Sequence, residues 1–128
     1  MGLFKRSLKG FLRMKRTTIK DFSEIGNLIR DNEKYKIYDI SFENWRVSMT
    51  KLHAHQSTTG HSHEKALEIY FFIEGEGKIQ INDEKNDVKK DDIILINKGE
   101  FHRVFNESDK ELIFICVFEE YEEREKIT

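Results

Sequence analysis

Apolar and polar residues alternate with a period of two along much of the chain, and this alternation predicts β-strands. The predicted strands are residues 36–42, 45–55, 67–74, 78–82, 91–99 (ending in a turn at 97–99), 102–106 and 111–120. Turn-forming residues at 74–77 and 82–86 predict chain reversals between them. Because no helix of roughly 10–15 residues interrupts the series, the pattern favours an antiparallel sandwich or small barrel over alternating strands and helices.

The region before the first strand has a different pattern. Residues 17–35 mix a few apolar side chains with polar ones and predict a short helix or turn over the edge of the core. The first sixteen residues carry six basic side chains and no acidic one, with apolar residues at roughly helical spacing. Such a segment fits a helix on an anionic membrane surface, a frayed or partner-docking helix, or an extension preceding a translation start at Met14. We therefore divide the chain into an N-terminal segment (1–35), a barrel (36–120) and an acidic tail (121–128).

Composition narrows the class of protein. A chain of 128 residues, 38% of them apolar, predicts one domain with a packed core. The formal net charge of -2 gives no reason to expect a nucleic-acid partner. No apolar run approaches the roughly 18 residues of a membrane span, and no signal peptide is recognisable. We therefore expect no membrane association and a cytoplasmic location. Cys116, the single cysteine, excludes an intrachain disulfide and is expected to be a buried, inert thiol.

Two of the predicted strands suggest a partner subunit. Residues 67–74 and 111–120 are apolar on both faces, and so short a chain has few helices to cover the outer face. We therefore expect a homodimer.

Candidate chemistry concentrates between residues 60 and 75. His61, His63 and Glu68 offer two imidazoles and a carboxylate, which suit a divalent transition metal such as Mn, Fe, Co, Ni or Zn. His102 is the natural fourth ligand, because a later strand of a closed sheet can return beside the first.

Two spaced motifs contain these four residues. Residues 55–75 fit the pattern G-x5-H-x-H-x3,4-E-x6-G except that His55 stands at the first glycine. Residues 91–106 fit the pattern G-x5-P-x-G-x2-H-x3-N except that Asp91 and Asn97 replace its glycine and proline. In both motifs the chain resembles the cupin superfamily. The resemblance implies an all-β fold, the double-stranded β-helix or jelly-roll barrel, with one divalent metal (Mn, Fe, Ni or Zn) held by His61, His63, Glu68 and His102.

The spacing of His63 and Glu68 adds a local expectation. They are of opposite parity, so one unbroken strand would send them to opposite faces, and the chain must turn or bulge between them. Thereafter Glu68, Tyr70 and Phe72 should face the interior, and Ile69, Phe71 and Ile73 the outside. Asn106 is expected to brace its local turn rather than to bind the metal.

Further residues are candidates for catalysis or substrate contact. His53 and His55 form a second H-x-H pair and are expected at the barrel mouth as general bases or substrate contacts, with a ligand role and a surface position as alternatives. Candidate substrate contacts are Tyr70, Gln80 and Lys51, together with Trp45, Arg46 and Arg103.

The length and motif spacing look most like small cupins related to phosphomannose isomerase and archaeal phosphoglucose isomerase. That resemblance implies a metal-dependent isomerase or epimerase acting on a sugar, a sugar phosphate or a similar small polar molecule. Two alternatives stay open: an Fe(II)-dependent dioxygenase, and a non-catalytic module that binds a small molecule or carbohydrate.

Overall fold

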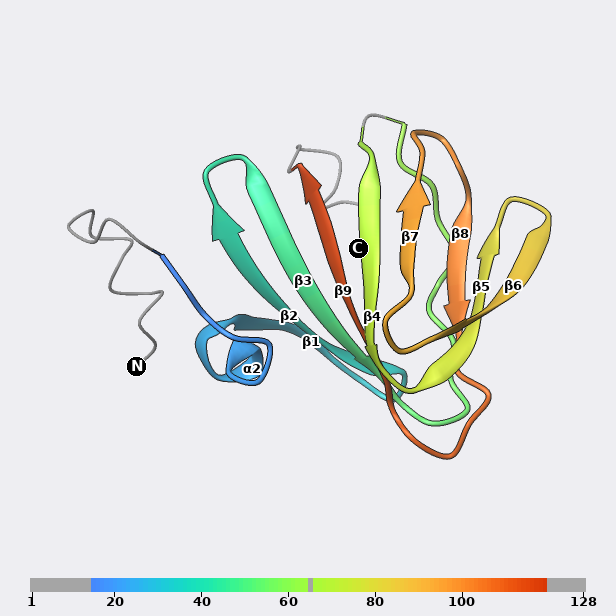
Figure 1. Ribbon diagram of the computed structural model, residues 1–128, viewed down its shortest axis with the longest axis horizontal. Helices are drawn as coiled ribbons and strands as arrows, with labels where there is room; N and C mark the ends of the chain where they lie inside the picture. Colours follow the sequence, from blue (N-terminus) through green and yellow to red (C-terminus); the bar gives the residue numbers. More distant parts are fainter. Residues whose placement is uncertain (1–14, 65, 120–128) are drawn as a thin grey trace.

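The computed structural model describes residues 15–64 and 66–119, which form one short helix and nine strands (Figure 1). In chain order these are α2 (Phe22–Ile25), β1 (Asn27–Asp31), β2 (Tyr35–Phe42), β3 (Trp45–Leu52), β4 (Glu68–Glu74), β5 (Glu76–Ile81), β6 (Glu84–Lys89), β7 (Ile93–Ile96), β8 (His102–Phe105) and β9 (Leu112–Glu119).

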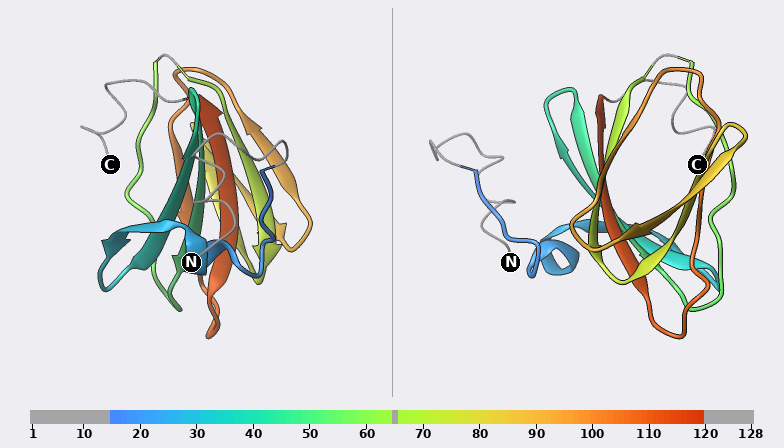
Figure 2. Two further views of the ribbon diagram at one scale, coloured as in Figure 1. Left: turned by 90° about the vertical axis from the view of Figure 1, so that its left-hand side faces the viewer. Right: turned by 45° about the vertical axis from the view of Figure 1, so that its right-hand side comes forward.

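The strands form two antiparallel sheets. Six lie in the order β1-β2-β3-β9-β4-β7, and three in the order β6-β5-β8. The sheets face each other across a shared interior, and the described strands remain two sheets rather than one closed barrel (Figure 2). The expected all-β jelly roll is thereby confirmed.

A continuous apolar core fills the space between the sheets. Its buried members are Leu52, Tyr70, Phe72, Ile79, Val88, Ile96, Val104, Leu112, Phe114, Cys116 and Phe118. Aromatic rings at its centre pack closely, with Tyr70 stacked on Phe114 at 5.3 Å between ring centroids. Each such fully buried side chain stabilises the fold by about 1.5–3 kcal/mol. The predicted inward orientation of Tyr70 and Phe72 is confirmed.

The outer face of the six-stranded sheet carries a second apolar cluster. Phe22 and Ile25 of α2 pack there with Ile40, Met49 and Ile115, and Phe71 and Ile73 lie half-buried against them. The helix therefore covers part of the surface that the sequence analysis assigned to a partner subunit. On β7, at the edge of the sheet, Ile93 and Leu95 stay 58% and 67% exposed.

Two strands were not predicted. β6 begins inside residues 82–86, which were expected to form only a reversal. It was not predicted because its side chains are polar and exposed except for Val88. β1 lies within residues 17–35, where a helix or turn was expected. The helix is present as α2, but the following residues pair with β2 as an edge strand whose Leu28 points to solvent, so no alternation marks it.

Of the basic segment formed by the first sixteen residues, residues 1–14 lie outside the described residues, and so does the predicted acidic tail, residues 121–128. Within the described ranges, no helix has both the length and the apolar character needed to cross a membrane.

Candidate metal centre

Four side chains from three separate segments meet between the sheets. His61 and His63 come from the loop that follows β3, Glu68 begins β4, and His102 begins β8. Their ligand atoms all lie within 4.8 Å of one another, and all four residues except His61 are fully buried. The predicted cluster of three histidines and one glutamate is therefore present.

Backbone hydrogen bonds fasten the ligand loop to β8. His61 N donates to His102 O at 3.2 Å, and His102 N donates to His61 O at 2.9 Å. Gly99 N donates to His63 O at 2.7 Å. Residues 64, 66 and 67 form no strand, so the expected break between His63 and Glu68 is confirmed.

Hydrogen bonds to main-chain carbonyls orient two of the imidazoles. His61 Nδ1 lies 3.2 Å from Thr59 O, and His102 Nδ1 lies 3.0 Å from Glu100 O. Because a carbonyl oxygen only accepts, each Nδ1 carries a proton, and in the neutral imidazole Nε2 then has the lone pair that a metal needs. The two rings are thus held in the tautomer suited to binding through Nε2.

Glu68 is a carboxylate buried between the two sheets. Its Oε2 lies 3.0 Å from His63 Nε2 and 3.3 Å from His102 Nε2, and its Oε1 accepts a hydrogen bond of 2.9 Å from the Cys116 thiol. Burial raises the pKa of Glu68, but the contacts with His102 and His63 and the thiol hydrogen bond outweigh it and hold that pKa far below its usual range. The site therefore offers a negative charge to a cation.

The donor set fits a divalent transition metal. Glu68 Oε2 and His102 Nε2 are buried and make no hydrogen bond with the described residues. Leaving such polar atoms unsatisfied in an apolar interior is unfavourable, and a cation bound between them removes that penalty. Three imidazoles and one carboxylate suit Mn, Fe, Ni or Zn better than Ca or Mg.

A cavity of about 150 Å³ reaches the cluster at His61. Its lining is Ile29, Arg30, Tyr35, Ile37, Ser48, Thr50, Thr58, Thr59, His61, Tyr70, Phe114 and Cys116. Arg30 gives these lining residues a positive charge, and no carboxylate is among them. Tyr70 also packs edge-on against the ring of His102 at 5.9 Å, which joins the cavity wall to the metal ligands.

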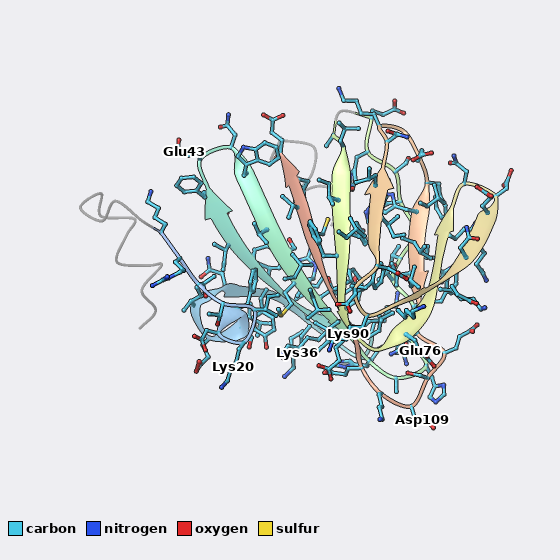
Figure 3. All side chains as sticks on the ribbon, in the orientation of Figure 1. Lys20, Lys36, Glu43, Glu76, Lys90 and Asp109 are labelled. Carbon is cyan, nitrogen blue, oxygen red and sulfur yellow. The ribbon has the colours of Figure 1, made fainter. Side chains whose placement is uncertain are left out.

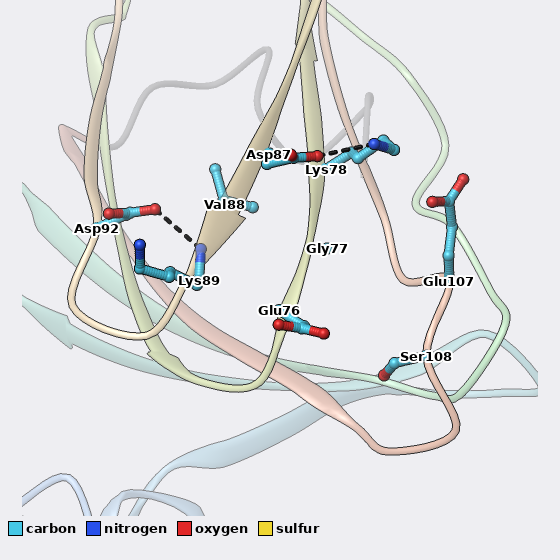
Figure 4. A pocket seen from close by; sticks show the side chains of 9 residues that line it. All are labelled: Glu76, Gly77, Lys78, Asp87, Val88, Lys89, Asp92, Glu107 and Ser108. Carbon is cyan, nitrogen blue, oxygen red and sulfur yellow. Dashed lines mark hydrogen bonds and ion pairs between the residues drawn. The ribbon is translucent and has the colours of Figure 1, made fainter.

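A second, larger cavity of about 480 Å³ lies beside β5 and β6 (Figure 4). Its lining is Glu76, Gly77, Lys78, Asp87, Val88, Lys89, Asp92, Glu107 and Ser108. Although it is larger, it contains none of the clustered ligands, and Lys78 and Asp87 already neutralise each other at 2.7 Å. We therefore assign the chemistry to the smaller cavity.

The two upstream histidines lie away from the cluster. His53 pairs with Glu111 at 3.0 Å, and the largely exposed His55 pairs with Asp109 at 2.7 Å. Asp109 is at the lower end of the molecule in Figure 3, whereas β4 starts with Glu68 at the upper end in Figure 1. On β9, Leu112 pairs with Leu52 at the end of β3, and Phe118 pairs with Glu68 at the start of β4. These two partners are six residues apart, which is about 20 Å at ~3.3 Å per residue. The arrangement matches the surface alternative, and a catalytic role stays a prediction.

Of the three predicted substrate contacts, only Tyr70 lines the cavity. Gln80 lies opposite Arg103 in the β5–β8 ladder and donates to Asn82 O, while Lys51 lies over the ring of Tyr38. Gln80 and Lys51 are absent from the cavity lining, and their substrate roles stay predictions.

The other candidate contacts are also spread out. Arg46 binds Asp39 at 3.2 Å, Arg103 donates to Thr58 O at 2.8 Å, and Trp45 is 50% exposed.

Asn106 braces the loops below the core, as expected. Its amide nitrogen lies within hydrogen-bond distance of the carbonyl oxygens of Leu52, His53 and Lys110, at 3.0, 3.1 and 2.7 Å. Its Oδ1 accepts hydrogen bonds from Ser108 N and Oγ. The residue thus ties the end of β3 to the turn before β9.

Sequence reasoning missed Cys116 and Arg30. Cys116 was predicted to be buried, which is correct, but its contact with Glu68 depends on the pairing of β9 with β4. Arg30 lies on the unpredicted strand β1, and only the alignment of that edge strand places it at the cavity.

Comparisons with known proteins agree with this architecture. A family model described as a cupin domain matches residues 48–118. An oxalate-binding protein from Thermotoga maritima is 33% identical over 57 residues, which are 44% of this chain and 47% of that protein. The chain thus aligns with somewhat less than half the length of its curated relatives.

Solved structures show the same fold. A Klebsiella pneumoniae protein with a double-stranded β-helix domain superimposes with a TM-score of 0.70 at 17% identity, over 84% of this chain and 90% of that one. A Thermotoga maritima protein described as a predicted oxalate decarboxylase superimposes with a TM-score of 0.65 at 24% identity, over 76% and 90%. The narrower resemblance to phosphomannose isomerase is not confirmed by these matches.

Proposed function

Because the chain belongs to the cupin-domain family and gathers three imidazoles and a carboxylate into one buried cluster, we propose that it binds a divalent transition metal and, beside it, a small carboxylate-bearing molecule. The observation that carries the choice of ligand is the cavity at His61, which is small and contains Arg30 but no acidic side chain among its described lining residues.

The size of the cavity favours a ligand of few atoms. Its volume is about 150 Å³. Sites for drug-sized ligands are larger, about 300–1,000 Å³. A two- to four-carbon carboxylate fits this space more readily than a sugar phosphate does.

The lining residues have distinct roles in this proposal. Arg30 supplies the positive charge that pairs with a carboxylate, and the hydroxyl of Thr50 supplies a neutral hydrogen bond beside it. Tyr70 and Phe114 close the apolar wall and limit the entry of water. A metal bound by the cluster supplies Lewis acidity toward a ligand oxygen.

The relatives support the same class of ligand. One is named an oxalate-binding protein and another a predicted oxalate decarboxylase, and oxalate is a two-carbon dicarboxylate. The chain aligns with only part of the first, and its identity to the second is low. Binding of a small carboxylate is therefore our proposal for this chain.

The test begins with metal analysis of untagged protein, followed by calorimetric titration of the metal-loaded and chelator-treated forms with oxalate, a three-carbon keto acid and glucose 6-phosphate. We expect the small carboxylates to bind only the loaded form. Arg30→Gln should weaken that binding about 10-fold, the effect of losing one charged hydrogen bond, while Arg30→Lys retains part of it. Binding that is independent of metal and of Arg30 contradicts the proposal.

The sugar phosphate in this panel tests the function implied by the sequence resemblance, an isomerase or epimerase. Preference for glucose 6-phosphate over both carboxylates would favour that function and reject ours. Oxygen consumption with Fe²⁺ but not with Zn²⁺ would instead favour a dioxygenase. A cytoplasmic location fits the lone reduced thiol and stays part of the proposal.

A further inference from the structure

The thiol of Cys116 touches one of the four clustered side chains. It donates a hydrogen bond of 2.9 Å to Glu68 Oε1, and the two residues are 4% and 2% exposed. They lie on neighbouring strands, where Cys116 is directly opposite Tyr70 and therefore diagonal to Glu68 in the β4–β9 ladder. Such a diagonal contact is fixed by the register of two central strands and not by a mobile loop.

The two oxygens of Glu68 consequently have different surroundings. Oε1 is engaged by the thiol, whereas Oε2 faces His63 and His102 at 3.0 and 3.3 Å and makes no hydrogen bond with the described residues. A carboxylate can offer a cation one oxygen or both. A hydrogen-bond donor held on one oxygen favours binding of the cation through the other oxygen alone.

We propose that Cys116 is a positioning residue of the metal centre, whose thiol engages Oε1 of Glu68 so that the carboxylate presents Oε2 alone to the ion. The inference rests on the metal site of the proposed function and adds to it a residue outside the four ligands. Hydrogen-bonding partners of metal ligands orient those ligands and tune their affinity. By limiting Glu68 to one oxygen, Cys116 keeps a position at the ion for an incoming ligand.

A competing explanation is that Cys116 only fills space. It belongs to the inner core, and a small thiol there packs like any apolar group. The two explanations differ in what replaces the thiol successfully: a positioning role needs a hydrogen-bond donor, whereas packing needs only volume.

Three variants separate the explanations. Cys116→Ser keeps a donor of similar size, Cys116→Ala removes it, and Val117→Ala is a matched truncation of the adjacent residue, whose side chain packs on the outer face. For each folded protein, the dissociation constant of Mn²⁺ is measured by competition with a chelator. The visible spectrum of the Co²⁺-loaded form is recorded as well, since it reports the number of ligands around the ion.

We expect Cys116→Ala to weaken Mn²⁺ binding by about 10-fold, within the 10–100-fold range for lost partners of metal ligands, and to change the Co²⁺ spectrum. For Cys116→Ser and Val117→Ala, the Mn²⁺ dissociation constant should stay within about 3-fold of the wild-type value, and the Co²⁺ spectrum should match that of the wild type.

Wild-type affinity and spectrum in Cys116→Ala overturn the inference, and so does equal weakening in the serine and alanine variants. A wild-type protein that binds no metal overturns the proposed function instead, so the two failures are distinguishable.

Discussion

His55 and Asp91 both hold left-handed backbone conformations, with φ of 62° and 81°. These are the two positions at which the cupin motifs carry glycine and this chain does not. The turns are therefore kept although the residues best suited to them are absent. A side chain in this region stores strain of about 1–2 kcal/mol, which the surrounding strands must sustain.

Restoring glycine at position 91 should stabilise the protein. The side chain of Asp91 is exposed, while its backbone N–H donates to Phe72 O at 2.8 Å and fixes the turn. We expect Asp91→Gly to raise the free energy of unfolding by about 0.5–1 kcal/mol, because relief of strain exceeds the added freedom of the unfolded chain. Asp91→Ala should lower it. Urea denaturation of the three proteins checks the order, and a glycine variant less stable than the alanine variant contradicts the account.

Removing the metal should lower thermal stability. At a free metal concentration about 100 times the dissociation constant, binding adds about 2.7 kcal/mol, and its loss to a chelator should lower Tm by roughly 10 °C. His102→Ala and Glu68→Gln should lose most of this difference. His53→Gln, which changes a histidine outside the cluster, should keep it. Calorimetric scans with and without chelator give the comparison.

Asn106→Ala should be among the more destabilising single substitutions. It leaves the buried carbonyls near the end of β3 without their shared donor, and we expect a loss of about 2–4 kcal/mol. Ser108→Ala removes only a hydroxyl from the same turn and should cost about 1 kcal/mol. Equal effects of the two in urea titrations would mean that Asn106 is not the centre of this network.

The Lys78–Asp87 pair on the surface of the second sheet should give a stability that depends on pH and salt. Their mutual hydrogen bond, then their charges, raise the pKa of Lys78 and lower the pKa of Asp87. The contribution of Asp87 is present above its ordinary pKa and lost as pH falls through the lowered one. That of Lys78 is present below its ordinary pKa and lost as pH rises through the raised one.

For this pair the measured quantity is the difference in Tm between wild type and Asp87→Asn. It should be small at neutral pH and low salt, and should vanish in acid and at about 1 M salt, where the screening length is ~3 Å. A difference unchanged by salt would contradict an exposed ion pair.

We propose that the homodimer expected from the sequence forms at β7. This strand is the edge of the six-stranded sheet beyond the reach of α2, and it exposes Ile93 and Leu95. Leu95→Lys should shift a dimer toward monomer in sedimentation velocity. Ile19→Lys, at an exposed apolar residue before α2, should not. A wild type that sediments as a monomer at working concentration rejects the dimer itself.

The four clustered residues could be predicted because the motif spacing encodes them directly. His61 and His63 need no long-range information, and the parity of Glu68 required the break that residues 64, 66 and 67 provide. The inward and outward faces of β4 followed from its alternation in the same way. Local pattern was sufficient wherever one face of a strand is buried.

Other features depend on register between distant segments. Cys116 and Glu68 are 48 positions apart, and only the β4–β9 ladder brings them together. The polar strand β6 is held by pairing with β5 rather than by burial, so its composition resembles a loop. His53 and His55 repeat the H-x-H spacing of the ligands, but the chain leaves β3 at the opposite end of the core, and spacing alone does not encode that position.

The place of β9 also bears on how the protein folds. The last described strand lies between β3 and β4, so the six-stranded sheet is two unconnected pieces until it inserts. Pairings between such distant segments form slowly, because the chain must first close long loops. A nascent chain that has not yet released β9 from the ribosome has every metal ligand, but Glu68 is then held only by the pairing of β4 with β7 and lacks its contact with Cys116. Metal loading should therefore follow synthesis of β9, and β3 and β4 should depend on chaperones in the interval.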